Sequence, residues 1–467
     1  MEAMTLDQLK ATLRGELIQP GDAKYADACK VYNGMIHRKP TYIAYCADVS
    51  DVRAAVNFGR ENGLLIAIRG GGHNGGGLGI CDDGLVIDLS RIKYTYVDPV
   101  TKTVRAGGGC VWGDVDHSTH GFGMATPSGI IGTTGVGGLT LGGGIGHLSR
   151  KCGLSIDNLL EAQVVLADGS VVTASEKENS DLFWAIRGGG GNFGIVTSFL
   201  FRLHPIDTVY AGPMFWDLEK APEIMKWYRD FIKTAPDDLN GFFAFLVVPA
   251  GPPFPEHLHM RNVCGIVWCY TGPLENGEKT FADIRTKFGT PILDWVGPIP
   301  HPALQSMFDA LYVPGLQWYW RADFVKELSD EAIAQHMKYG GNIPTMFSTM
   351  HLYPVNGKAG QPKPGDTAWH NRDAVWAQVI VGVDPDPANA EKITKWCKDY
   401  YNALHPYGHG GGAYVNFMMD EGQDRIKASY GENYDRLVAI KAKYDPKNIF
   451  RVNQNIKPVA EGSKASA

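Results

Sequence analysis

Hydrophobic residues in the first two hundred positions form short runs that are interrupted by glycine and other turn residues. Such runs predict short strands, and they cover residues 64–68, 85–89, 94–97, 103–106, 163–166, 171–173 and 195–201. Residues 50–62 instead have helical spacing and end in Asn62-Gly63, a typical C-terminal cap. Asp168-Gly169 between two of the runs predicts a hairpin. This region is therefore expected to be α+β.

The pattern changes near His204-Pro205, where glycine becomes rarer and the alternating segments become longer. Helical spacing at 221–233 and 330–337 is interspersed with strand-like segments at 242–248, 263–268 and 377–383. This arrangement predicts one antiparallel sheet backed by helices, as a second domain of nearly two hundred residues.

Three glycine-dense segments stand out, at 69–77, 135–146 and 188–194. Glycine lets backbone N–H groups approach a bulky anion such as a pyrophosphate. The first segment also contains His73, so it predicts a phosphate cradle with one reactive side chain; ordinary turns are the alternative. The third matches the dinucleotide fingerprint by letter. However, a helix precedes it and a strand follows it, which is the reverse of the Rossmann order.

Composition narrows the function classes. The 467-residue chain has a net charge of −6 and no Lys/Arg run, which argues against nucleic-acid or anionic-membrane partners and favours a small molecule. Its N-terminus lacks a secretory signal and no apolar run could span a membrane, so a cytoplasmic location is expected unless an export signal has been removed. The eight cysteines have no regular spacing, which predicts free thiols and no metal site.

Four segments together resemble the berberine-bridge-enzyme-like oxidases, FAD enzymes of the vanillyl-alcohol-oxidase superfamily. They are 69–75, 135–158, 181–196, and Tyr414-x-Asn416 with Tyr444-Asp445-Pro446. The resemblance runs from about residue 38 to the C-terminus. It implies a PCMH-type FAD-binding domain at 1–207 (core 38–207), a substrate-binding domain at 208–408, and a C-terminal return to the FAD domain at 409–467.

The same resemblance implies which residues bind FAD. His73 would carry a covalent bond to the flavin 8α carbon, because a neutral imidazole can attack that activated position; a His that only hydrogen-bonds a phosphate is the alternative. The other implied contacts are Arg69, Gly70, Gly71, Gly72, Asn74, Gly75, Thr133, Thr134, Gly135, Gly137, Gly138, Gly142, Gly143, Gly146, Asp157, Asn158, Gly194, Ile195, Val196, Tyr414 and Asn416.

Residues 131–135 depart from the family pattern. Many relatives have a cysteine that makes a second flavin bond, whereas this chain has Ile131 at that position. One covalent link is therefore expected, and neither Cys110 nor Cys152 lies in the family segment. Thr134 replaces a common valine of similar volume and adds a hydroxyl. It should leave room for O2, which predicts an oxidase, and as an extension the flavin could transfer oxygen to substrate.

Acid–base candidates come from the C-terminal part. Tyr414 is the first choice for base or substrate anchor, with Asn416 beside it on the same face if the segment is a strand; alternatively Tyr414 only packs on the flavin. His351 is the second choice because it titrates near neutrality, while His117, His120 and His147 are interpreted as structural. Aromatic and imidazole side chains that could roof the flavin are Phe243, Phe245, Trp268, Tyr270, His351 and Tyr353, with Trp318, Tyr319 and Trp320 nearby.

These features predict an FAD-dependent oxidase that passes hydride from a small aromatic, phenolic, polyketide or alkaloid-type substrate to the flavin, with O2 as acceptor. An oligosaccharide or sugar oxidase is the alternative enzyme, because aromatic shelves also stack on sugar rings. A non-catalytic flavin-binding redox protein is the alternative of another class. The expected assembly is a monomer or homodimer.

Overall fold

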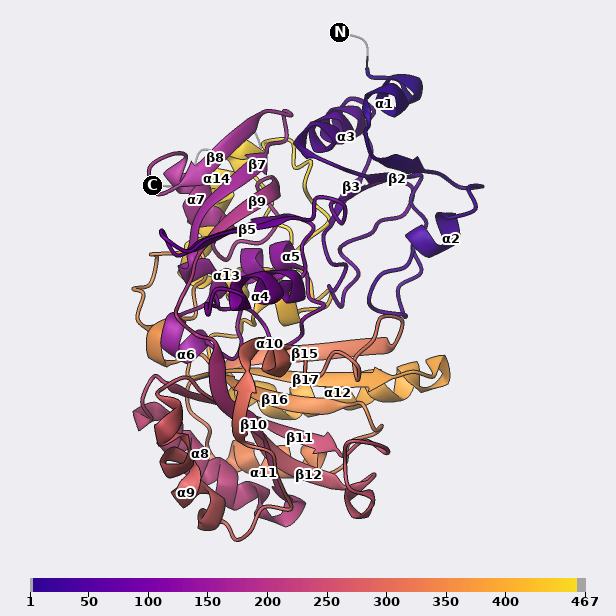
Figure 1. The fold of residues 1–467 in the computed structure, drawn as a ribbon. Coiled ribbons are helices and arrows are strands. Elements are labelled where there is room, and N and C mark those ends of the chain that lie inside the picture. Colours follow the sequence, from indigo (N-terminus) through magenta and orange to yellow (C-terminus); the bar gives the residue numbers. More distant parts are fainter. Residues whose placement is uncertain (1–2, 460–467) are drawn as a thin grey trace.

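The first glycine-rich segment leaves the edge strand of a four-stranded sheet at the N-terminal end of the molecule (Figure 1). The computed structural model describes residues 3–459. β4 lies parallel to β2 and β3, and β1 lies antiparallel to β2. These elements are α1 (Leu6–Thr12), β1 (Glu16–Ile18), α2 (Tyr25–Ala28), β2 (Tyr42–Tyr45), α3 (Val49–Glu61), β3 (Ile66–Arg69) and β4 (Leu85–Asp88). The predicted cap of α3 is confirmed, since Asn62 ends the helix and Gly63 follows with φ +64°.

A five-stranded antiparallel sheet, ordered β5-β6-β9-β7-β8, lies next in the same half of the molecule. Its strands are β5 (Thr95–Asp98), β6 (Thr103–Gly107), β7 (Leu159–Val165), β8 (Val171–Ser175) and β9 (Ile195–Arg202), and the helices inserted among them are α4 (Trp112–His120), α5 (Val136–Gly142), α6 (Ser149–Cys152) and α7 (Ser180–Ile186). The predicted hairpin at Asp168-Gly169 joins β7 to β8. All three glycine segments therefore belong to this half.

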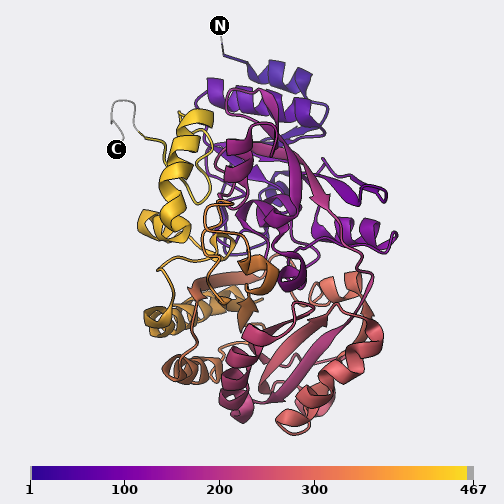
Figure 2. The ribbon, with the colours of Figure 1, turned by 90° about the vertical axis from the view of Figure 1, so that its left-hand side faces the viewer.

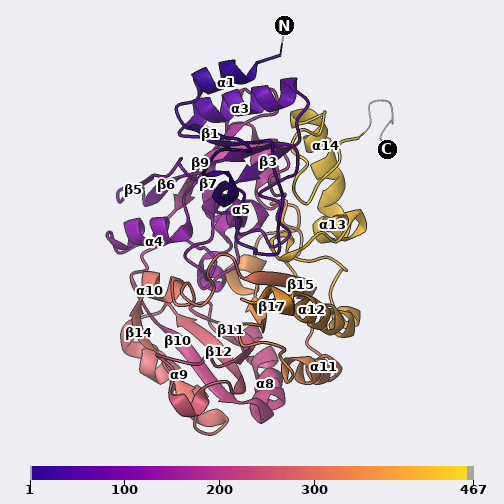
Figure 3. The same ribbon diagram turned by 90° about the vertical axis from the view of Figure 1, so that its right-hand side faces the viewer.

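The other half is built on an eight-stranded antiparallel sheet, ordered β13-β10-β12-β11-β16-β17-β15, with β14 also on β10 (Figures 1 and 3). Its strands are β10 (Thr208–Asp217), β11 (Leu239–Val247), β12 (Asn262–Tyr270), β13 (Leu293–Asp294), β14 (Gly297–Pro300), β15 (Gln317–Val325), β16 (Thr349–Pro354) and β17 (Trp376–Asp384). One face packs on α8 (Ala221–Thr234), α9 (Gly277–Lys287), α11 (Asp330–Gly340) and α12 (Ala390–Leu404). The predicted helix-backed antiparallel sheet is confirmed.

The last part of the chain returns to the first half. After α12 it passes the junction of the two halves, and α13 (Gln423–Tyr430) and α14 (Tyr434–Tyr444) then pack along the flank of the N-terminal half (Figure 2). The short helix α10 (His301–Gln305) lies against α4. All eight cysteines are free. None of the helices in residues 3–459 has the length and apolarity needed to cross a membrane.

Candidate active site

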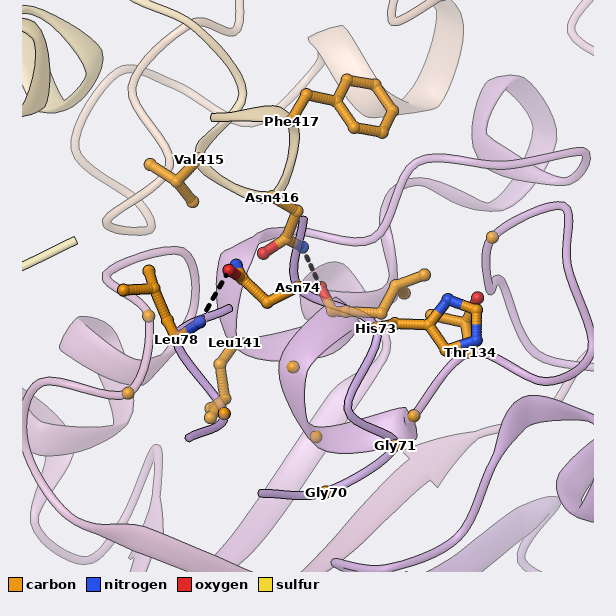
Figure 4. A pocket seen from close by; sticks show the side chains of 18 of the residues that line it. Gly70, Gly71, His73, Asn74, Leu78, Thr134, Leu141, Val415, Asn416 and Phe417 are labelled. Carbon is orange, nitrogen blue, oxygen red and sulfur yellow. Dashed lines mark hydrogen bonds between the residues drawn. The ribbon is translucent and has the colours of Figure 1, made fainter. Parts of the chain in front are cut away.

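A cavity of about 350 Å³ lies where the two halves and the C-terminal return meet. The three glycine segments form its floor, β15, β16 and β17 form its roof, and residues 414–417 and 452–454 form a side. Figure 4 shows His73, Asn74 and Thr134 on one wall, with Val415, Asn416 and Phe417 opposite. Its described lining contains no Asp, Glu or Lys, and the one Arg, Arg69, turns its guanidinium to Asp88 and to the carbonyl of Ala28.

Two glycine segments cross at Gly71 and Gly135 with no room for a side chain. A Cβ on Gly135 would lie 2.5 Å from the Gly71 nitrogen, and a Cβ on Gly71 would lie 2.5 Å from the Gly135 nitrogen. Both distances are far below ordinary carbon–nitrogen contact, so only glycine permits this approach. The crossing leaves bare backbone along the cavity floor, which suits the pyrophosphate of a dinucleotide.

The third glycine segment is held in place by the second segment and by the C-terminal return. The N–H groups of Gly188 and Gly190 donate to the carbonyl of Leu141 at 3.1 and 2.9 Å. Asn192 donates to the carbonyl of Gln454 at 3.1 Å, and the N–H of Ile456 donates back to its Oδ1 at 2.9 Å. Gly190, Gly191, Asn192 and Gln454 all line the cavity. An elongated ligand can therefore extend from His73 to residues 452–454.

The imidazole of His73 lies between Tyr32 and Thr133. Its ring stacks on Tyr32 with centroids 3.8 Å apart, and Nε2 lies 3.0 Å from Thr133 Oγ1. Within the described residues Nδ1 makes no hydrogen bond. Burial lowers the pKa of His73 to about 4, so the ring is uncharged at neutral pH. These properties, together with the bare glycine backbone, fit an FAD whose isoalloxazine ring reaches His73.

Tyr414 and Asn416 act as one unit, although not for the predicted reason. Residues Val415–Phe417 form a 3₁₀ turn, so the expected strand is wrong. The turn nevertheless brings the two side chains together: Asn416 Nδ2 donates to Tyr414 Oη at 2.8 Å, and the Gly144 N–H donates to the same oxygen at 2.8 Å. Burial raises the pKa of Tyr414 to about 12, which keeps its hydroxyl protonated at neutral pH.

The roof presents His351 and Tyr353 to the cavity. His351 Nδ1 lies 2.6 Å from Tyr353 Oη, and burial lowers the pKa of His351 to about 3. Trp318 and Trp320 also line the cavity, whereas Tyr319 faces the helices. Phe243, Phe245, Trp268 and Tyr270, which the sequence suggested for the roof, pack under the helices on the opposite face of the sheet. Their place over the flavin is therefore corrected.

Several residues predicted to contact FAD lie outside the cavity lining, and the structure gives them other roles. Asp157 makes a bidentate pair with Arg372 at 2.7 and 2.8 Å, and Asn158 donates to two carbonyls of its own turn and pairs with His204. Glycine is needed at 75, 142, 143 and 146 because a Cβ there would collide with neighbouring atoms. Thr133 contacts the His73 imidazole through its hydroxyl. The predicted residues that do line the cavity are Arg69, Gly70, Gly71, Gly72, His73, Asn74, Thr134, Gly135, Gly137, Gly138, Gly194, Ile195, Val196, Tyr414 and Asn416.

Other lining residues were not found from the sequence. They include three tyrosines and a C-terminal segment, namely Tyr32, Tyr312, Tyr430, Val452, Asn453 and Gln454. Tyr32 and Tyr312 meet because the Tyr32 hydroxyl donates to the carbonyl of Tyr312 at 2.6 Å across the two halves. Such pairings carry no local sequence signal, although an aromatic residue close to a glycine loop in space is a reasonable candidate once the fold is known.

Comparisons with known proteins agree with this geometry. Residues 40–175 match the FAD binding domain family, and residues 413–457 match the berberine and berberine like family. An FAD-linked oxidoreductase of Dictyostelium discoideum is 33% identical over 96% of both chains. (R)-6-hydroxynicotine oxidase of Paenarthrobacter nicotinovorans is 28% identical over 97% of this chain and 98% of its own.

Solved structures show the same fold over nearly the whole chain. The crystal structure of 6-hydroxy-D-nicotine oxidase from Arthrobacter nicotinovorans superposes with a TM-score of 0.84 at 26% identity, covering 95% of this chain and 98% of that one. A chitooligosaccharide oxidase superposes with a TM-score of 0.81 at 25% identity, covering 97% and 99%. FAD is thus the cofactor, a small molecule is the substrate and O2 is the acceptor. The chain belongs to the berberine-bridge-enzyme-like family of FAD-linked oxidases.

Proposed function

We propose that FAD is tethered to this oxidase by one covalent bond, from His73 Nδ1 to the flavin 8α carbon. The observation that carries the proposal is the asymmetry of the imidazole, whose Nε2 is engaged by Thr133 while Nδ1 is free. A second tether has no thiol to form it. Ile131 lines the cavity at the position of the second attachment in relatives, and none of the eight cysteines lines it.

The bound flavin supplies the redox step by accepting a hydride and passing electrons to O2. The protein supplies position and proton transfer. Tyr414 Oη already accepts two hydrogen bonds, so its O–H is the group left to donate to a substrate oxygen or nitrogen. We assign it the role of anchor, because a pKa of about 12 prevents it from acting as a resting base at neutral pH.

We assign the base role to His351. With its pKa lowered to about 3, the ring is unprotonated throughout the neutral range, and Tyr353 holds Nδ1 while Nε2 makes no hydrogen bond within residues 3–459. A substrate O–H or N–H becomes strongly acidic as the neighbouring C–H hydrogen leaves. A neutral imidazole within reach can then take that proton even though it is a weak base at rest.

The substrate chamber favours a flat and uncharged molecule. Trp318, Trp320, Tyr353 and Phe417 form its walls, and its described lining offers no free carboxylate or ammonium group. The relatives include oxidases named for a hydroxynicotine and for chitooligosaccharides. A sugar ring needs many hydrogen-bond partners, which this apolar chamber supplies sparingly, so we favour an aromatic, phenolic, polyketide or alkaloid-type substrate. Thr134 at the wall leaves space for O2 and offers a hydroxyl for the extension to oxygen transfer.

One experiment tests the tether and a second tests the substrate class. Acid-precipitated protein should retain its yellow colour and gain the mass of one FAD, and His73→Ala should release the flavin. Release of the flavin from the wild-type protein would refute the tether.

The second experiment compares O2 consumption by the enzyme with different substrates. Hydroxylated N-heterocycles and phenols should support faster O2 consumption than chito-, xylo- and cello-oligosaccharides. A preference for oligosaccharides would establish the sugar oxidase instead.

A further inference from the structure

One segment of the C-terminal half, residues 306–316 between α10 and β15, makes hydrogen bonds on two sides of His73, to Gly132 and to Tyr32. Asp309 binds the turn 131–134 that carries Thr133, and the carbonyl of Tyr312 binds Tyr32, whose ring stacks on the imidazole. The nucleophile proposed above is thus positioned by residues more than two hundred positions away in the sequence.

The first contact runs through the turn 131–134. Asp309 Oδ1 accepts a hydrogen bond from the Gly132 N–H at 2.8 Å, and a Cβ on Gly132 would lie 2.7 Å from Asp309 Oδ2. Burial raises the pKa of Asp309, while the N–H groups of Gly132 and Thr133 act in the opposite direction. Thr133 follows Gly132 in the same turn, and its Oγ1 lies 3.0 Å from His73 Nε2.

The second contact runs through the aromatic ring. Tyr32 stacks on His73 at an interplanar angle of 20°, and its hydroxyl donates to the Tyr312 carbonyl at 2.6 Å. The backbone of Tyr32 is also fixed on both sides, since its N–H donates to the carbonyl of Gly72 at 3.1 Å and its own carbonyl accepts from Gly315 at 2.9 Å. Movement of this segment would therefore displace the ring that stacks on the imidazole.

We propose that Asp309 is a positioning residue for flavin attachment. It acts through Thr133 to keep the His73 proton on Nε2 and the lone pair on Nδ1, so attachment requires segment 306–316 to be docked. This proposal rests on the covalent link proposed above. The new C–N bond replaces one C–H bond of the 8α-methyl group, and the imidazole gives up its Nε2 proton. The two electrons and two protons released reduce the flavin, and O2 re-oxidises it with formation of hydrogen peroxide.

Thr133 provides a matched pair of variants. Thr133→Val keeps the shape and removes the hydroxyl, whereas Thr133→Ser keeps the hydroxyl. Protein produced under riboflavin limitation would be mixed with FAD, and the acid-stable flavin fluorescence would be followed against time, with total bound FAD and Tm measured on the same samples. We expect attachment about tenfold slower in Thr133→Val, equivalent to about 1.4 kcal/mol in the barrier, and close to the wild-type rate in Thr133→Ser.

Asp309→Ala removes the acceptor of the Gly132 N–H and should slow attachment similarly. The double variant Asp309→Ala/Thr133→Val should be no slower than Thr133→Val, because both act on one contact with His73. Gly132→Ala perturbs the Asp309 contact from the other side and serves if Asp309→Ala folds poorly. Asp386→Ala, which removes a remote cap at Ala388, is the control and should leave the rate unchanged.

The outcomes separate the two proposals. Wild-type protein without acid-stable flavin would overturn the covalent link itself. A wild-type protein that attaches flavin normally, with Asp309→Ala and Gly132→Ala at the same rate, would overturn only the role of Asp309. Additive slowing in the double variant would also overturn it, because a general loss of packing adds to the loss of the Thr133 hydroxyl whereas one shared contact does not.

Discussion

The buried ion pair between Lys441 and Asp445 holds the C-terminal return against the third glycine segment. Both side chains are fully buried, and Lys441 Nζ donates to Asp445 Oδ2 at 2.6 Å and to the carbonyls of Asn192 and Phe450 at 2.7 and 2.8 Å. Lys441→Met removes all three contacts and leaves a buried carboxylate without its cation. Breaking one partner out of such a pair costs about 3–5 kcal/mol.

This loss predicts a measurable shift in thermal unfolding. For a chain of 467 residues the unfolding entropy is about 1 kcal/mol per kelvin, so the cost corresponds to a Tm lower by about 3–5 °C. Differential scanning calorimetry at pH 7 would measure it. Lys443→Met on the same helix is the control, because Lys443 pairs with Asp181 at an exposed position and should leave Tm unchanged. Equal Tm values for the wild type and Lys441→Met would refute the reasoning.

Three further predictions concern pH and packing. Burial raises the pKa of Asp116 in the folded chain. The free energy of unfolding should therefore fall as pH rises from the unfolded pKa near 4 through the folded value, by up to about 1.4 kcal/mol per pH unit. Urea titrations at several pH values should show that this slope disappears in Asp116→Asn. Gly135→Ala should lose bound FAD and be less stable by about 1–3 kcal/mol, because the new Cβ would collide with the backbone of Gly71. Gly121→Ala is the control and should retain FAD, because its Cβ would make only one ordinary contact. Because the pKa of His351 is lowered to about 3, kcat/KM should show no titration of an enzyme group near pH 6.5 and should fall only toward pH 3. An inflection near pH 6.5 that disappears in His351→Gln would contradict this assignment.

Local signals were sufficient for much of the fold. The Asn62-Gly63 cap, the Asp168-Gly169 hairpin and the glycine segments each depend on neighbouring residues, and the structure contains all of them. Local signals did not show which face of the roof sheet meets the cavity. Ala244 lies opposite His351 and Phe243 lies opposite Leu352. Because side chains alternate along a strand, an error of one position places Phe243 and Phe245 on the wrong face.

The remaining site residues depend on contacts that no local pattern encodes. Tyr32 stacks on His73 from outside the resembling segments, and Asp309 reaches Gly132 across 177 positions. Asp157 shows the converse case. It lies inside a resembling segment, yet a bidentate contact with Arg372 gives it a structural role. Membership of a motif therefore predicted the neighbourhood of the cavity more reliably than it predicted a place in the cavity lining.

The order in which the chain is made gives the C-terminal return another consequence. Tyr414, Asn416 and residues 452–454 line the same cavity as glycine segments that end near residue 194. At roughly 5–20 residues per second of synthesis, the glycine segments precede the C-terminal wall by roughly ten to fifty seconds. The cavity is therefore closed only after translation has passed residue 454, and a chain truncated before Tyr414 is expected to bind FAD more weakly.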